Sequence, residues 1–340
     1  MDAPIFIVGA NRSGTTLLRL ILNAHSRIAI PDELVYITPY VANVGIYAWR
    51  DPGMHPSYYA SFVRNFLQGN AEVLSPLDLD ALAQDITTST SPNLRSPYQM
   101  ALEAWADHHG KQRWGEKTPS NIFYADAILD MFPDAHFIHV IRDPRGGVAS
   151  MQGVKFFADD VALNALNRKK YLTEGQDTLE QHVPSGQRTV VRYEDLVREP
   201  KATMRCLCDF LSEPFEPSML RFYEDSERYM RDEATRSFNA AATHPISPAK
   251  IDEWKDRLSP QDVGIVESIC RQQMKAYNYD LAMLPLSLTT KLEVLFKTAY
   301  WHWQMWRNRH IKHYLVKHRI FARTKTRSQQ LANSLSYSTR

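Results

Sequence analysis

A glycine-rich turn near the N-terminus constrains the fold of this chain more than any other feature. Residues 9–16 read Gly-Ala-Asn-Arg-Ser-Gly-Thr-Thr, after the apolar run 4–8 and before the apolar run 17–22. A buried strand, a tight turn and a helix are therefore expected in direct succession. In such a turn, glycines bring backbone N–H groups and the positive end of the helix close to an anion. The pattern predicts an α/β fold with a phosphate cradle.

The residues of the turn indicate which kind of phosphate group it can bind. A nucleoside triphosphatase needs a lysine after the second glycine, where this chain has Thr15, whereas Arg12 lies inside the turn. A kinase also needs an aspartate at a strand end for magnesium, and the candidate strand ends in Arg142 before Asp143. The turn therefore suits a 5′-phosphate group better than a magnesium triphosphate, with a kinase-like nucleotide-binding protein as the alternative.

A second succession of strand, turn and helix start lies far downstream. The apolar run 135–141 is followed by Arg142 and, after two glycines, by Ser150. An arginine fork and a neutral hydroxyl are both suited to the oxygens of a phosphate. We expect these two side chains to bind a second phosphate group.

Together the two patterns resemble the PAPS-dependent sulfotransferases, and the resemblance is nearest to the bacterial and tyrosylprotein branch. Segments 116–119, 190–196 and 244–255 extend it, in the order of the family, over roughly residues 4–280. The resemblance implies PAPS as co-substrate and 3′,5′-bisphosphoadenosine as product. By a looser match it places Ser237 and Lys250 near the nucleotide. The cofactor-binding residues that it implies are Arg12, Ser13, Gly14, Thr15, Thr16, Arg142 and Ser150.

The resemblance also implies an in-line transfer of the sulfuryl group to a hydroxyl or phenol acceptor. Negative charge then grows on the oxygen that leaves with the 5′-phosphate, so nearby cations favour the reaction without obligatory magnesium. Arg12 and Lys117 match the positions of two such catalytic cations. Glu33, at a matching offset and just after the predicted strand 27–30, is expected to be the general base, with Asp32 as its rival.

The rest of the chain is typical of a P-loop-type parallel sheet with helices on both faces. Apolar runs predict strands at 4–8, 27–30, 113–115, 135–141 and 188–192. Helical patterns occur at 57–68, 77–87, 98–109, 159–182, 200–212 and 260–276. We expect residues 1–285 to form a sulfotransferase domain, with a helical insertion at about 40–110 on its acceptor side.

Residues 286–340 are predicted to form a basic, aromatic helical tail. Residues 294–340 hold ten Lys and Arg and no Asp or Glu, which leaves 30 basic against 38 acidic residues in 1–293. A helix over 294–327 rich in Trp, Tyr, Lys and Arg can lie on an anionic membrane, or pack on the acidic remainder or on another subunit. Nucleic acid is a poorer partner, because the rest of the chain is acidic and has no recognised binding module.

The cysteines and histidines indicate neither a disulfide framework nor a metal site. Three cysteines are too few and lack zinc-site spacing, and the twelve histidines form no pattern typical of ligands. The chain has no leader-like N-terminus and no apolar run long enough to span a membrane. We therefore expect a cytoplasmic protein whose tail is the one candidate for membrane contact.

The acceptor is not identified by any motif in the helical segment 40–110. Peptide tyrosine, carbohydrate, lipid and small-molecule hydroxyls all agree with the resemblance. A catalytically silent nucleotide-binding interaction protein would keep the cradle without the base and cations, and Glu33 and Lys117 argue against it.

Overall fold

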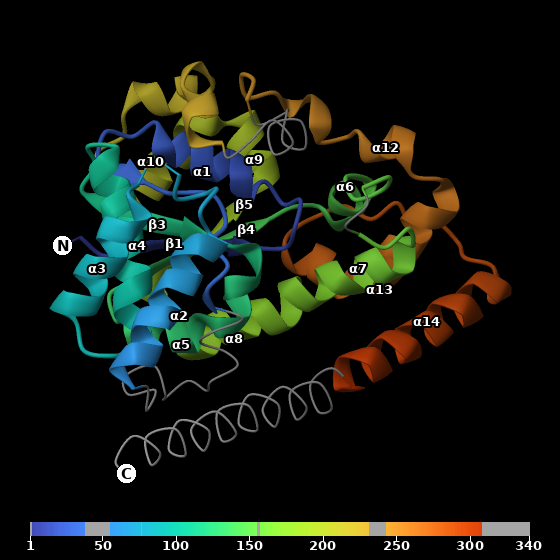
Figure 1. Ribbon diagram of the computed structural model, residues 1–340. Helices are drawn as coiled ribbons and strands as arrows, with labels where there is room; N and C mark the ends of the chain where they lie inside the picture. Colours follow the sequence, from blue (N-terminus) through green and yellow to red (C-terminus); the bar gives the residue numbers. More distant parts are fainter. Residues whose placement is uncertain (1, 38–54, 76, 155–156, 231–242, 308–340) are drawn as a thin grey trace, which may run out of the picture. The chain divides into compact units, whose positions relative to one another are not determined.

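The computed structural model describes residues 2–37, 55–75, 77–154, 157–230 and 243–307. The chain divides into two compact units, Met1–Ser287 and Leu288–Arg340. The first unit is built around a five-stranded sheet (Figure 1). The second contains one described helix, α14 (Leu288–Arg307).

All five strands of the sheet are parallel and lie where the sequence predicts them. Their order is β2-β3-β1-β4-β5, and the register places Ile7 beside both Lys117 and Ile138. The carboxyl ends of neighbouring strands therefore meet at one edge of the sheet, where open α/β sheets bind ligands. The strands are β1 (Ile5–Gly9), β2 (Ile28–Ala29), β3 (Arg113–Lys117), β4 (His136–Ile141) and β5 (Arg188–Arg192).

The centre of the sheet is buried on both faces, which explains why its strands read as apolar runs. Every residue of β1 is buried. The ring of Phe6 stacks on Phe137 with centroids 5.4 Å apart, and its other contacts include the edge of Trp114 at 6.0 Å. Continuous apolar sequence is the signature of a parallel strand covered by helices, and here it anchors the turns at the edge of the sheet.

Helices cover both faces of the sheet, as predicted (Figure 1). One face carries α1 (Thr15–Asn23), α9 (Tyr193–Arg198) and α10 (Pro200–Leu211). The other carries α5 (Ala125–Met131) and α8 (Gln176–His182). The predicted helix 159–182 consists of α7 (Val161–Lys170), a single π-helical turn (Tyr171–Gly175) and α8.

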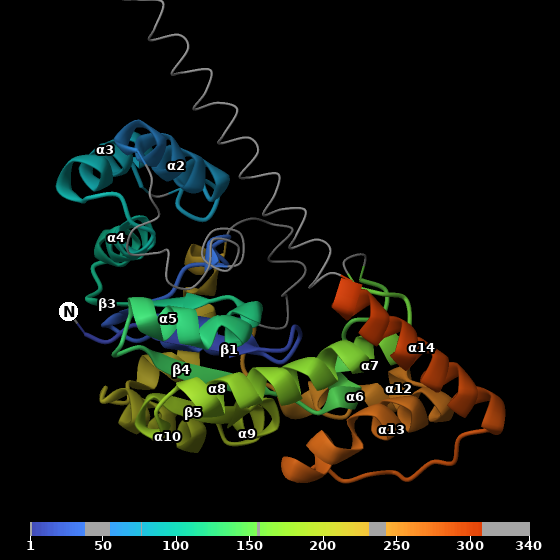
Figure 2. The ribbon, with the colours of Figure 1, turned by 90° about the horizontal axis from the view of Figure 1, so that it is seen from below.

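Three helices occupy the described part of the predicted insertion. They are α2 (Pro56–Gly69), α3 (Leu79–Ser89) and α4 (Arg95–His108), and Figure 2 shows them beyond the β3 side of the sheet. Their starts lie within three residues of the predicted ones, because proline or a capping aspartate marks two of them. Residues 38–54 and 76 of the insertion lie outside the described residues. Its role on the acceptor side stays a prediction.

A buried ion cluster holds the turn that follows β4. This turn leads into α6 (Pro144–Ala149), which packs with α7, α12 (Trp254–Arg257) and α13 (Pro260–Ala276). Arg145 bonds to Asp143 at 2.7 Å and to Glu267 of α13 at 2.7 Å, and its guanidinium lies 4.1 Å from the centre of the Trp254 ring. These contacts position the segment that carries Arg142 and Ser150.

Candidate active site

The glycine-rich turn between β1 and α1 adopts the conformation of an anion cradle. Gly14 is the N-cap of α1, with a left-handed φ of 97°, and Arg12 also has a positive φ of 64°. A Cβ atom on Gly14 would lie 2.6 Å from Cδ2 of Tyr193, so both the backbone angle and the space require glycine. The first turn of α1 contains no acidic residue. Its N–H groups and positive dipole therefore suit an anion.

Arg168, which the sequence did not single out, supports this turn through two hydrogen bonds. It is fully buried, and its guanidinium donates to the carbonyl of Asn11 at 2.7 Å and to Oγ of Ser13 at 3.1 Å. Burial, and secondarily the charge of Arg142, lower the pKa of Arg168 to about 10. A Cβ atom on Gly147 would overlap the Arg168 guanidinium at 1.9 Å. The glycine of α6 thus makes room for a buried cation beneath the cradle.

Arg142 joins the cradle to the segment after β4. Its guanidinium donates to the carbonyl of Arg12 at 3.3 Å and to the carbonyl of Lys250 at 3.0 Å, and it lies 4.3 Å from the centre of the Tyr193 ring. Its Nε atom is buried and has no hydrogen-bond partner among the described residues. Lys250 approaches through its backbone while its side chain is exposed, and Ser237 lies outside the described residues.

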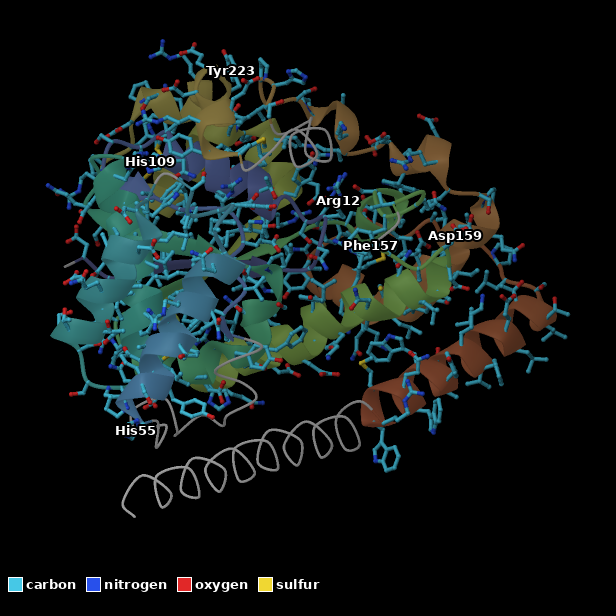
Figure 3. All side chains as sticks on the ribbon, viewed as in Figure 1. Arg12, His55, His109, Phe157, Asp159 and Tyr223 are labelled. Carbon is cyan, nitrogen blue, oxygen red and sulfur yellow. The ribbon has the colours of Figure 1, made fainter. Side chains whose placement is uncertain are left out.

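The two segments that the sequence predicts to bind phosphate are in direct contact. Arg12 Nε donates to Oγ of Ser150, 138 residues away, at 3.0 Å. In Figure 3 Arg12 lies between the start of α1 and α6. Burial, followed by the charge of Arg142, lowers the pKa of Arg12. The structure therefore brings two cations close together at a place where an anion would relieve their repulsion.

The serine hydroxyls of the cradle keep a hydrogen available for a ligand. Ser13 and Ser150 each accept a hydrogen bond from a guanidinium, so each O–H can donate to a further acceptor. Thr15 and Thr16 begin α1 and add two hydroxyls at its positive end. The predicted cofactor-binding residues thus come from two segments, one after β1 and one after β4, which the hydrogen bond from Arg12 to Ser150 joins.

A second cluster of charged side chains lies after β2 and β3, on the opposite side of β1 from β4. Lys117 ends β3, is 2% exposed, and bonds to Oε1 of Glu33 at 2.5 Å. Its Nζ atom also lies 3.5 Å from Oδ1 of Asp32, and buried Arg19 reaches the same oxygen at 3.8 Å. Asp32 is thus held between two cations and its side chain is 13% exposed, whereas that of Glu33 is 49% exposed. Of the two rival carboxylates, Glu33 is the more accessible.

Glu116, beside Lys117, is a further carboxyl group that the sequence analysis did not single out. It is fully buried and accepts hydrogen bonds from the hydroxyl of Thr118 and from Nδ2 of Asn121, the latter at 2.7 Å. Burial raises the pKa of Glu116 to about 7, against the effect of these hydrogen bonds and of Lys117. Its position in β3 and the small polar residues after it fix the backbone from which Lys117 extends.

Asp143, the aspartate nearest to the place of a kinase's magnesium ligand, is engaged in other contacts. Both carboxylate oxygens of Asp143 accept hydrogen bonds from Arg145, and Oδ1 also caps the start of α6. In the described part of the chain, no group of three or more His, Cys, Asp or Glu side chains is placed to hold a metal ion. His139 packs inside β4 and donates from Nδ1 to Gln176 at 2.7 Å, and burial lowers its pKa to about 4.

Comparison with known proteins identifies the family. The profile of the sulfotransferase family matches residues 4–217. Protein-tyrosine sulfotransferase A of Caenorhabditis elegans is 23% identical over 286 residues, which are 81% of this chain and 67% of that protein. Carbohydrate sulfotransferase 3 of Mus musculus is 25% identical over 193 residues, 50% of this chain and 39% of that protein. The chain thus spans only part of the length of both relatives.

A solved structure agrees with the assignment of the fold. The sulfotransferase domain from the Synechococcus PCC 7002 olefin synthase superposes with a TM-score of 0.59 at 24% identity, covering 83% of this chain and 97% of that domain. This similarity concerns the arrangement of strands and helices. With the family profile, it confirms the resemblance seen in the sequence, and the chain belongs to the sulfotransferase family.

Proposed function

We propose that this chain transfers the sulfuryl group of PAPS to a hydroxyl or phenol acceptor. The observation that carries the proposal is the order of charged groups along one edge of the sheet. Glu33 follows β2, Lys117 ends β3, the cradle follows β1 and Arg142 follows β4. Along this edge a proton acceptor is followed by a cation, a phosphate cradle and a second phosphate ligand. This spatial order is the one that an in-line transfer requires.

The cradle fits the two phosphate groups of the co-substrate. Arg142 and Ser150 are suited to the 3′-phosphate, and the turn 9–16 is suited to the 5′-phosphosulfate. The buried Nε atom of Arg142, which lacks a partner among the described residues, supports an anionic occupant. PAPS supplies an activated sulfuryl group whose leaving group is a phosphate. In the proposed reaction PAPS is therefore the co-substrate, and 3′,5′-bisphosphoadenosine is the product.

Two side chains on the acceptor side have distinct roles in the proposal. A carboxylate oxygen of Glu33 takes the proton from the acceptor hydroxyl as its oxygen attacks sulfur. Lys117 orients that carboxylate through the 2.5 Å contact and, with Arg12, provides positive charge near the reacting atoms. Asp32 is the weaker candidate for the base, because Lys117, Arg19 and the backbone N–H of Glu33 all contact it.

The acceptor belongs to the class of hydroxyl compounds. One similar protein is named for sulfation of protein tyrosine and another for sulfation of carbohydrate, so hydroxyls of different acidity occur among the relatives. Peptide tyrosine, carbohydrate, lipid and small molecules all remain within this class. The cluster of Lys117 with two carboxylates suits an acceptor that must lose a proton during attack.

Calorimetric titration separates this proposal from a kinase-like protein. We expect 3′,5′-bisphosphoadenosine to bind without magnesium and more tightly than ATP with magnesium. Incubation with labelled PAPS and a panel of phenols, sugars, lipids and tyrosine peptides then tests transfer. Preference for magnesium ATP would contradict the proposal, and nucleotide binding without transfer to any acceptor would favour the catalytically silent alternative.

A further inference from the structure

Helix α14 carries a continuous stripe of large apolar side chains along one side. The members recur at intervals of three, four and seven residues, which places them on one face of a helix. Each is 44–78% exposed. The stripe consists of Leu288, Leu292, Leu295, Phe296, Tyr300, Trp303 and Trp306. Soluble helices rarely present so many exposed aromatic and leucine side chains in one row, so the stripe indicates a binding surface.

Basic residues dominate the sequence around and beyond the stripe. Glu293 is the one acidic residue in 288–340, and it pairs with Lys297 at 2.5 Å. Seven further Lys and Arg lie between 308 and 327. The described helix ends at Arg307, next to two stripe tryptophans. In the sequence, the stripe is therefore followed directly by a strongly basic segment.

We propose that α14 lies flat on an anionic lipid surface, with the stripe among the acyl chains and the basic residues against the headgroups. Trp and Tyr favour the boundary between headgroups and acyl chains, and here they fill the C-terminal half of the stripe. Lys and Arg near a surface of anionic lipid each strengthen the association. No helix among the described residues is long and apolar enough to cross a membrane.

The charge of the tail opposes the pairing of two tails side by side. Two identical tails placed side by side bring ten basic residues each into proximity without an acidic counterpart in 294–340. Their repulsion opposes pairing, whereas the same charges all favour an anionic membrane. The lipid is therefore the occupant that both the apolar and the charged residues of the tail suit. This inference stands apart from sulfuryl transfer, because none of the residues proposed for the reaction lies in α14.

Vesicle co-sedimentation of the full chain tests the inference. We expect the protein to pellet with vesicles of phosphatidylcholine and phosphatidylserine, far less with phosphatidylcholine alone, and progressively less as salt increases. The double variant Trp303→Ser with Trp306→Ser should lower the partition coefficient by about tenfold or more, because two large apolar groups are lost. Trp301→Ser is the matched control, since Trp301 lies on the opposite side of the helix. It should bind vesicles like the wild type.

Three outcomes would overturn the inference. The first is wild-type protein that stays in the supernatant with anionic vesicles. The second is equal loss of binding in Trp301→Ser and in the double variant, which would show that the stripe is not the lipid-facing side. The third is a lipid-free dimer, seen by analytical ultracentrifugation, that the double variant abolishes. Circular dichroism and titration with 3′,5′-bisphosphoadenosine confirm for each variant that the fold is intact.

Discussion

The two halves of the sheet edge, one after β1 and β4 and the other after β2 and β3, differ in the groups that surround their positive charges. After β1 and β4, the hydrogen bonds of Arg142 and Arg168 go to carbonyl and hydroxyl oxygens, and burial and mutual repulsion lower the pKa of Arg168. After β2 and β3, Lys117 lies beside two carboxylates. The first arrangement leaves positive charge uncompensated for an anionic ligand, and the second holds carboxylates beside a cation. Nucleotide binding and proton transfer should therefore respond separately to mutation.

Replacing Glu33 should have the largest effect of these changes. The effect should be on turnover and not on nucleotide affinity, because Glu33 belongs to the carboxylate half of the sheet edge, which follows β2 and β3. Glu33→Gln keeps the shape of the side chain but removes the proton acceptor, so turnover should fall by about 10²- to 10⁴-fold while nucleotide affinity barely changes. Steady-state rates and calorimetric titration measure the two quantities. The loss should shrink along a series of phenols of increasing acidity, because these need less help in losing their proton.

Asp32→Asn is the matched control for this prediction. It removes one charge from the same cluster, and its effect on turnover should be much milder because Asp32 is already held by Lys117 and Arg19. A loss found in Asp32→Asn but not in Glu33→Gln would assign the base to Asp32 instead. Equal nucleotide affinity in both variants would support the separation of the two halves.

The pH dependence of stability should reveal the burial of the Glu116 carboxyl group, which lies beside Lys117 in β3. Folding raises its pKa from 4.5 to about 7, so between these values the folded chain keeps a proton that the unfolded chain has released. Wild type should therefore lose about 3 kcal/mol of unfolding free energy relative to Glu116→Gln as the pH rises through this window, with no further loss above it. Urea unfolding of both proteins at a series of pH values measures the difference. Parallel profiles would contradict a raised pKa.

Removing Arg142 should affect the opposite half. Arg142→Ala deletes the charge-assisted contact that we propose for the nucleotide, together with the hydrogen bond to the Arg12 carbonyl. Affinity for 3′,5′-bisphosphoadenosine should fall by about 10- to 100-fold, or about 1.5–3 kcal/mol. Arg64→Ala, which removes an exposed arginine from α2, serves as the control for net charge. Unchanged affinity in Arg142→Ala would overturn the assignment of the second phosphate site.

Ser150→Ala should have the smallest effect of the four. It removes one neutral donor and leaves the arginines in place, so nucleotide affinity should fall by about 2- to 10-fold, or about 0.5–1.5 kcal/mol. The same titration measures it. A loss as large as that of Arg142→Ala would mean that the hydrogen bond from Arg12 to Ser150 organises the whole cradle.

Features encoded in short stretches of sequence were predictable. The five strands were found because each is an apolar run bounded by turn residues, and the cradle was found because its glycines lie between a strand and a helix. The parallel arrangement then places every strand end on the same edge. This is why residues as distant as Arg12 and Ser150 could be expected to share a site.

Features that depend on contacts between distant segments were not predictable. Arg168 is one basic residue in a helix that also contains Lys169 and Lys170, and the sequence does not show that it alone is buried. Nor does it show that the carboxyl group of Glu116 is enclosed within the fold while that of Glu33 is half-exposed. The signal that could have pointed to Arg168 is the pair of glycines in α6, which leave space for a large neighbour.

The close fit between Gly147 and Arg168 has a consequence for the evolution of this protein. Any side chain at position 147 would occupy the volume of the Arg168 guanidinium, so the two positions are not free to change independently. An alanine at 147 would force the Arg168 guanidinium to shift, and such a shift, like a shorter residue at 168, withdraws the two donors from the cradle. A side chain at position 147 should therefore mark loss of the anion site in descendants of this protein, whether or not residue 168 has also changed.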